Sequence, residues 1–77
     1  MKKVIVKFDS IVAVQSFVDK MSRFSSDVDL ISGSRTVDAK SIIGVFSLDI
    51  SSPIVLSVDG KDENAVIEAV KDITVGA

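Results

Sequence analysis

Hydrophobic and polar residues alternate in several short segments of the chain, a pattern typical of β-strands that bury one face. In residues 3–8, Val4, Val6 and Phe8 fall on one side of the segment. Residues 54–58 form a nearly continuous apolar run instead, which indicates a strand in the middle of a sheet. The pattern therefore predicts two strands far apart in the sequence, one of them central.

Between these segments, a second pair of strands is predicted to form a hairpin. Val28 and Leu30 lie on one side of a strand that starts near Asp27, and residues 35–39 form the next strand. The intervening Gly33-Ser34 is typical of a tight turn, because glycine reaches backbone conformations that other residues avoid.

Three segments predict helices. From residue 11 to residue 24 apolar residues recur at spacings of three and four, which places them on one face of a helix. The stripe consists of Val14, Phe17, Val18, Met21 and Phe24, with Val12 and Ala13 outside it. Ser10 is suited to cap this helix, and Ser41 to cap a helix of one or two turns in residues 42–48.

The last helix is predicted to open at Asp62-Glu63, because acidic residues suit the positive end of a helix dipole. Its inner face is expected to carry Ala65, Val66, Ala69, Val70 and Ile73. The element order is then β-α-β-β-α-β-α. It predicts an α+β fold, an open-faced sandwich in which helices cover one face of a four-stranded, mostly antiparallel sheet. With 77 residues the chain has room for one core, so a single domain over residues 1–77 is expected.

Composition removes most catalytic chemistry. The chain has no cysteine and no histidine, which excludes thiolate nucleophiles, zinc–sulfur sites and histidine-based acid–base chemistry. Asp27 and Asp29 share the face of their strand opposite Val28 and Leu30, where a solvated surface is expected rather than a carboxylate pair. We therefore expect no enzyme activity, no metal site and no cofactor.

Charge and hydropathy limit the partners. The formal net charge is −2 and the cations are scattered, so direct nucleic-acid binding is not expected. No apolar run approaches the roughly 18 residues that indicate a membrane span, so no membrane association is predicted. A soluble, cytoplasmic protein is the expectation.

One segment carries a specific motif. Residues 34–49 read SRTVDAKSIIGVFSLD. At every position this segment resembles the regulatory-serine signature of the HPr family, the phosphocarriers of the bacterial sugar phosphotransferase system. The resemblance extends to residues 15–18, Phe24 and residues 59–63, and it implies the fold predicted above. It also implies that Ser41 is phosphorylated by a dedicated ATP-dependent serine kinase of the HPr type. A helix start independently suits a phosphate, through backbone donors and the dipole.

The same resemblance shows a departure at the family's other site. Counting back from Phe17 places Ser10 where the phosphotransfer histidine belongs, and Val12 where the phosphate-holding arginine belongs. A serine phosphate ester is far more stable than a phosphohistidine, and valine lacks the guanidinium fork. The resemblance therefore implies a degenerate phosphotransfer site. The chain is similar to the catabolite-repression members of the family, which lack the histidine.

The resemblance also implies a partner-binding surface on two helices. Its members are Ile11, Val12 and Gln15 of the first helix and Ile42, Ile43 and Phe46 of the short helix. The partners it implies are an HPr-type serine kinase, a LacI-type catabolite regulator and proteins of the phosphotransferase system. Asp19 and Ser22 stand where the family often carries lysines, which weakens docking to the usual phosphoryl donor.

Three hypotheses follow. The first is a regulatory module of the catabolite-repression type, controlled by phosphorylation of Ser41. The second is a constitutive protein-binding module that is never phosphorylated. The third, less favoured, is a phosphocarrier that uses Ser10.

Overall fold

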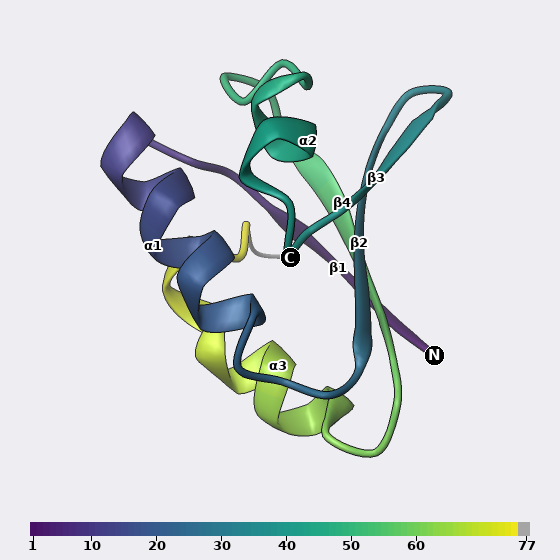
Figure 1. Ribbon diagram of the computed structural model, residues 1–77. Helices are drawn as coiled ribbons and strands as arrows, with labels where there is room; N and C mark the ends of the chain where they lie inside the picture. Colours follow the sequence, from purple (N-terminus) through teal and green to yellow (C-terminus); the bar gives the residue numbers. More distant parts are fainter. Residues whose placement is uncertain (76–77) are drawn as a thin grey trace.

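Four antiparallel strands form the sheet in the computed structural model, which describes residues 1–75 (Figure 1). The strands are β1 (Lys2–Val6), β2 (Asp27–Ser32), β3 (Arg35–Asp38) and β4 (Ile54–Asp59). Their order across the sheet is β1-β4-β2-β3, which confirms the central position predicted for β4. Residues 76–77 of the predicted domain lie outside the described residues.

The hairpin predicted between β2 and β3 is present. Ser32 pairs with Arg35, and Gly33 has a φ of 61°, a left-handed conformation in which glycine has no Cβ to clash. The register places Val28 and Leu30 on the buried face of the sheet and Asp27 on the exposed face, as the alternation predicted.

The helices lie on one side of this sheet (Figure 1). They are α1 (Ile11–Met21), α2 (Ile42–Phe46) and α3 (Glu63–Ala69), and a 3₁₀ turn, η1 (Lys71–Ile73), follows α3. This arrangement confirms the α+β sandwich and its element order. No helix within the described residues is long and apolar enough to cross a membrane.

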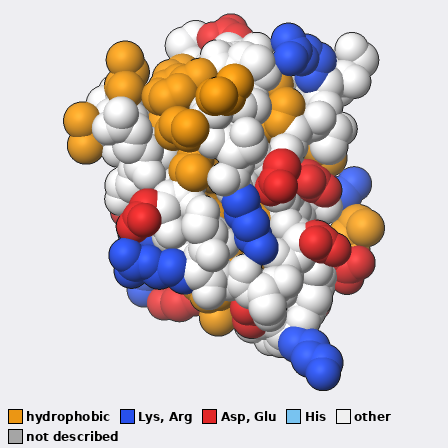
Figure 2. All heavy atoms as spheres, viewed as in Figure 1, with side chains coloured by type: hydrophobic (Ala, Val, Ile, Leu, Met, Phe, Trp, Pro, Cys, Tyr) orange, Lys and Arg blue, Asp and Glu red, His pale blue; other side chains and the backbone are white. Residues whose placement is uncertain are grey.

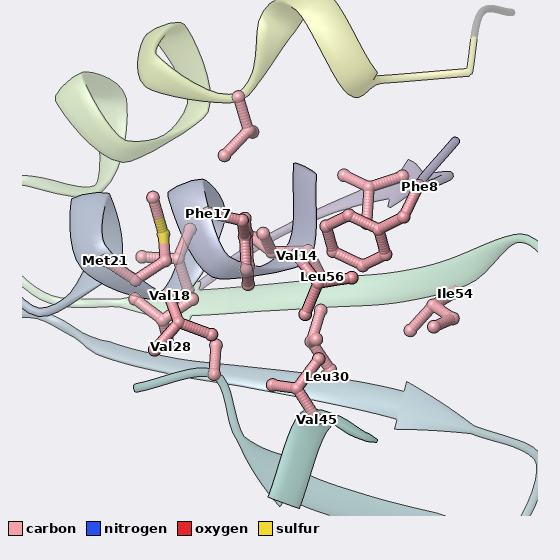
Figure 3. Close-up of a cluster of buried hydrophobic side chains, with 14 of the residues drawn as sticks. Phe8, Val14, Phe17, Val18, Met21, Val28, Leu30, Val45, Ile54 and Leu56 are labelled. Carbon is pink, nitrogen blue, oxygen red and sulfur yellow. The ribbon is translucent and has the colours of Figure 1, made fainter. Parts of the chain in front are cut away.

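The core lies between α1, α3 and the sheet. Val14 and Phe17 of α1 lie over Leu56 and Leu30 of the central strands, and Met21 lies in the same core beside Val18 and Val28 (Figure 3). Phe8 and Phe17 meet edge to face, with ring centroids 5.1 Å apart. Val45 brings α2 onto the same core, and this single buried residue sets which side of the short helix faces solvent.

Several boundaries differ from prediction. The first helix ends at Met21 and not at Phe24, because the N–H groups of Arg23 and Phe24 bond to carbonyls three residues back and form a tighter turn. Phe24 still packs against the core from outside the helix, as does Ala13, which the apolar stripe had left out. The first strand ends at Val6, although Phe8 is buried as expected.

The last helix is also shorter than predicted, and its inner face differs. The backbone N–H of Lys7 donates to the Ile73 carbonyl, and that of Val75 donates to the Ile5 carbonyl. These bonds draw the chain after Val70 back to the edge of β1, so the regular helix stops at Ala69. Ala65 is exposed where an inner position was expected, and Ile67 packs against the core instead.

Candidate functional site

Ser41 is the N-cap of α2, and its side chain is exposed. Its Oγ accepts a hydrogen bond from the Gly44 backbone N–H at 3.2 Å, and its own N–H donates to the Asp38 carbonyl at 3.0 Å. A Cβ added at Gly44 would lie 3.3 Å from this oxygen and 3.4 Å from the Val37 Cβ. The glycine therefore leaves room for the Ser41 hydroxyl at the start of the helix. The predicted cap is confirmed.

The two cations nearest to Ser41 in the sequence are both engaged elsewhere. The Lys40 ammonium donates to the Phe24 carbonyl at 2.8 Å, in a partly buried contact. The Arg35 guanidinium donates to the Ser47 hydroxyl at 3.0 Å, at the opposite end of α2. Among the described residues, neither forms a salt bridge. Sequence reasoning did not identify these contacts, because they join segments that only the tertiary structure brings together.

Ser10 has an equivalent position on the first helix. It is the N-cap of α1, and its Oγ accepts from the Ala13 backbone N–H at 3.1 Å. Its φ of −165° and ψ of 165° are extended, as expected for a residue that precedes a helix. Val12 is 71% exposed two residues later. The capping role predicted for Ser10 is confirmed, and Val12 presents only an aliphatic side chain to solvent.

Exposed apolar side chains gather on the helices that these two serines begin. Ile11 is 60% exposed, Ile43 is 81% exposed and Phe46 is 40% exposed. Figure 2 shows hydrophobic side chains over α2 and over the start of α1, and the two helices contact each other. We name the predicted surface the α1–α2 patch: Ile11, Val12, Gln15, Ile42, Ile43 and Phe46, all of them exposed.

The α1–α2 patch is also uncharged. Residues 10–18 and 41–48 contain no Lys, Arg, Asp or Glu. A contiguous apolar surface of this kind is typical of a protein–protein contact, since scattered single residues are the usual form of surface apolar area. The arrangement can bind a protein partner, and it contains no pair of groups suited to acid–base catalysis.

A group of carboxylates lies on the other face of the sheet. Asp29 pairs directly with Asp38 across β2 and β3, and Asp27 lies two residues before Asp29. Burial and, after it, the charges of Asp38 and Asp27 raise the pKa of Asp29 above its ordinary value. No cluster suited to a metal ion occurs among residues 1–75. Sequence reasoning placed Asp27 and Asp29 on one face of the strand, where a solvated surface was expected, and did not identify Asp38, which the hairpin register adds.

The fold and the site together define a small α+β protein that presents capped helix starts beside an apolar surface. Comparison with known proteins gives its family. Residues 10–74 match the family model described as the PTS HPr component phosphorylation site. The chain belongs to the HPr family of the phosphotransferase system.

Relatives and solved structures agree with this assignment. The phosphocarrier protein HPr of Xylella fastidiosa is 38% identical over 63 residues, which cover 79% of this chain and 71% of the relative. HPr-C-His of Thermoanaerobacter tengcongensis superposes with a TM-score of 0.84 and is 33% identical, covering 94% of this chain and 89% of that chain.

A third comparison is with Crh, the Bacillus subtilis catabolite repression protein, whose crystal structure is an intertwined dimer with a swapped domain. It is 32% identical, with a TM-score of 0.71, and covers 86% of this chain and 77% of its own.

Membership of the family has two direct consequences. HPr proteins are phosphocarriers and not catalytic enzymes, so the expectation of no enzyme activity is confirmed. The family also implies interaction with proteins of the phosphotransferase system.

Proposed function

We propose that this chain is a cytoplasmic regulatory module, a single HPr-like domain of residues 1–77, that has lost phosphotransfer and is controlled by phosphorylation of Ser41. The observation that carries the proposal is the position of Ser41. Its exposed hydroxyl begins α2 beside an uncharged apolar surface. The role is of the carbon catabolite repression type.

Loss of phosphotransfer follows from the residues at the start of α1. The chain contains no histidine, and Ser10 stands where the family's phosphotransfer histidine is expected. The Ser10 hydroxyl already accepts a capping bond from Ala13. A phosphate ester on serine is too stable to be handed to an acceptor as a phosphohistidine is. Val12, in place of the arginine, offers no donor to a phosphate.

Phosphorylation of Ser41 would change the charge of an otherwise uncharged surface. A phosphate adds about −1.5 to −2 charge at neutral pH and three acceptor oxygens. Lys40 is held by the Phe24 carbonyl and Arg35 by Ser47. Neither of these two cations is then free to neutralise the phosphate. It remains available to an arginine of a partner, which can bind it through two parallel hydrogen bonds.

The partner in this proposal combines an apolar contact with cationic side chains. A LacI-type catabolite regulator fits this requirement, and an HPr-type serine kinase must recognise the same segment to modify it. The likeness to Crh supports the catabolite-repression role. The protein does not bind nucleic acid directly in this proposal, because its net charge is −2 before phosphorylation.

The experiment is phosphorylation with labelled ATP and an HPr-type serine kinase. We expect the wild-type protein to take up label and Ser41→Ala to take up none. Two matched controls are available. Ser10→Ala removes the equivalent cap from α1, and Ser47→Ala removes another exposed serine from the end of α2; both should be labelled like the wild type. Absence of label on the wild type, with a kinase that modifies a known substrate, would contradict the proposal.

A second candidate is a constitutive binding module. It is favoured by the Ser41 cap itself, since a serine that accepts from Gly44 already has a structural role. A pull-down that recovers the same partners with wild type and Ser41→Ala would favour this candidate. Phosphocarrier activity through Ser10 predicts a phosphoryl group on Ser10 after incubation with labelled phosphoenolpyruvate and enzyme I, and we expect none.

A further inference from the structure

The uncovered face of the sheet carries an apolar row that the core does not use. Ile5 on β1 pairs with Val55 on β4, and Val55 pairs with Ile31 on β2. None of the three packs against the core, and Ile5 is 47% exposed. The helices lie on the opposite side of the sheet, so no described element covers this row (Figure 1).

The next row across the same face is charged, and its two ends differ in sign. Lys3 on β1 pairs with Ser57 on β4, Ser57 pairs with Asp29 on β2, and Asp29 pairs with Asp38 on β3. The face is therefore basic at β1 and acidic at β2 and β3. Within residues 1–75, Lys3, Asp29 and Asp38 form no salt bridge.

We propose that two copies of this chain associate through this open face of the sheet. The two sheets stack face to face, and the two-fold axis runs between them, parallel to the strands and level with the gap between β4 and β2. This rotation places β1 of one copy over β3 of the other. Lys3 then faces Asp38 of the second copy, and Ser57 faces Asp29. In the neighbouring row Val55 faces Ile31, and Ile5 faces Thr36. One rotation thus places Val55 against Ile31 and Lys3 against Asp38, each twice by symmetry, and brings no like charges together in these two rows, the self-complementarity that a two-fold interface requires.

The second copy is the occupant that the charges select. A partner of uniform charge would be repelled by one half of the face, whereas a second copy presents the opposite order of charges. Its lysine would also relieve the crowding of carboxylates, because the charges of Asp38 and Asp27, together with burial, already raise the pKa of Asp29. Two sheets packed in this way lie about 10 Å apart, a distance that lysine and aspartate side chains can bridge together.

The apolar row is short, so the association is reversible and weak compared with permanent dimers, which bury about 1,000 Å² or more per partner. Asp27 and Asp59 lie in the row beyond Lys3 and would face each other across the axis. Their repulsion limits the affinity at the rim. The contact uses neither Ser41 nor the α1–α2 patch, so it does not depend on the function proposed above.

Sedimentation equilibrium of the full chain, up to about 1 mM at low salt, tests the proposal. We expect the average mass to rise with concentration and to fall toward the monomer value when salt is added. Lys3→Glu should weaken association about tenfold or more, since each substitution removes two symmetric contacts. Ile31→Ser should weaken it as well. The matched controls are Lys71→Glu and Ile43→Ser, which make the same changes on the helical side, and neither should alter association.

A charge exchange keeps the test valid if one variant folds poorly. The double variant Lys3→Glu/Asp38→Lys retains the net charge and restores opposite signs across the interface, so it should associate again. A wild-type protein that stays monomeric at all concentrations would overturn the proposal. So would association that Lys3→Glu leaves unchanged, or that Ile43→Ser abolishes.

Discussion

The Ser26 hydroxyl donates a hydrogen bond to the Asp62 carboxylate, and this contact joins the start of β2 to the start of α3 across 36 positions of sequence. The same carboxylate accepts from the backbone N–H groups of Ser25 at 3.0 Å and Ser26 at 3.1 Å. Asp62 makes no side-chain cap bond to its own helix. Asp62 was expected to stabilise α3 through the helix dipole. Its hydrogen bonds instead connect the segment before β2 to the start of α3.

This contact predicts a pH dependence of stability. The hydrogen bond from Ser26, followed by those from the two backbone groups and Ser25, lowers the pKa of Asp62 despite an opposing effect of burial. A lowered pKa in the folded state means that the carboxylate stabilises the fold above its unfolded pKa of about 3.9, and that this contribution is lost as pH falls through the folded pKa.

We therefore expect Asp62→Asn to lower the free energy of unfolding at pH 7 and to matter much less at pH values well below 3.9. Urea unfolding of both proteins at the two pH values measures this. Asp9→Asn changes an exposed aspartate without a hydrogen bond or ion pair in the described residues and should have little effect at either pH. An equal loss at both pH values would contradict the assignment.

Gly60 lies against the same serine and is expected to be intolerant of any side chain. Its φ is 154°, and a Cβ added there would lie 2.8 Å from the Ser26 Cα, a backbone atom that cannot move aside cheaply. We expect Gly60→Ala to destabilise the protein by more than about 2 kcal/mol.

Gly33 is the matched control for this substitution. It also has a positive φ, 61°, but nothing lies within 4 Å of an added Cβ. Gly33→Ala should therefore cost only the backbone conformation, about 1 kcal/mol. Chemical denaturation of both variants gives the comparison. A larger effect at Gly33 than at Gly60 would show that conformation, and not the contact with Ser26, dominates.

Truncation of Leu56 and truncation of Ile43 are predicted to have very different effects on the stability of the protein. Leu56 is fully buried at the centre of β4, so Leu56→Ala should cost about 2–5 kcal/mol of stability through lost burial and a residual cavity. Ile43 is 81% exposed, so Ile43→Ala should change stability by no more than about 0.5 kcal/mol. If Ile43→Ala instead unfolds the protein, the α1–α2 patch is not a free surface.

The engagement of Lys40 predicts how a phosphate on Ser41 would titrate. Since the Lys40 ammonium is held by the Phe24 carbonyl, it should not lower the second pKa of the phosphate, which is about 6 for an ordinary phosphoserine. Phosphorus NMR of phosphorylated wild type and Lys40→Gln should give the same value, with Lys61→Gln as a distant control. If the ammonium paired with the phosphate instead, the pKa would be lower in wild type and would rise in Lys40→Gln.

Replacing either cap serine by alanine should lower the stability of the protein by a similar amount, whereas only the replacement of Ser41 should affect partner binding. Both accept from the N–H three residues ahead, at 3.1 Å in α1 and 3.2 Å in α2. Ser10→Ala and Ser41→Ala should each lower stability by about 0.5–2 kcal/mol in thermal or urea unfolding. If only Ser41→Ala also changes partner capture, the functional asymmetry does not come from the caps.

Several features of the site were predictable from the sequence for local reasons. Ser10 and Ser41 precede apolar helical segments, and a serine hydroxyl in that position reaches the free N–H groups of the first turn. The exposure of Ile43 follows from the short helix itself, because a five-residue helix cannot bury every apolar residue it carries. These predictions needed only neighbours within three or four positions.

Other features depended on which distant segments meet. Ala65 is exposed and Ile67 packs against the core, because the packing of α3 on the rest of the fold, and not its own apolar spacing, decides which side of the helix faces inward. The engagement of Lys40 by Phe24 and of Arg35 by Ser47 likewise depends on how α1, β3 and α2 pack together. No local pattern carries that information.

The amino-acid sequence by itself determined the element order, the buried stripe of α1, the central position of β4 and the two serine caps. These features depend on side-chain periodicity and on hydrogen bonds within a single turn of the chain. Only the tertiary structure decided that Asp62 accepts a hydrogen bond from Ser26. It also decided that Asp38 lies beside Asp29, and that Lys3 lies in the same row of the sheet as these two residues. Strand register and helix packing bring those residues together, because contacts between segments depend on the whole fold and not on spacing along the chain.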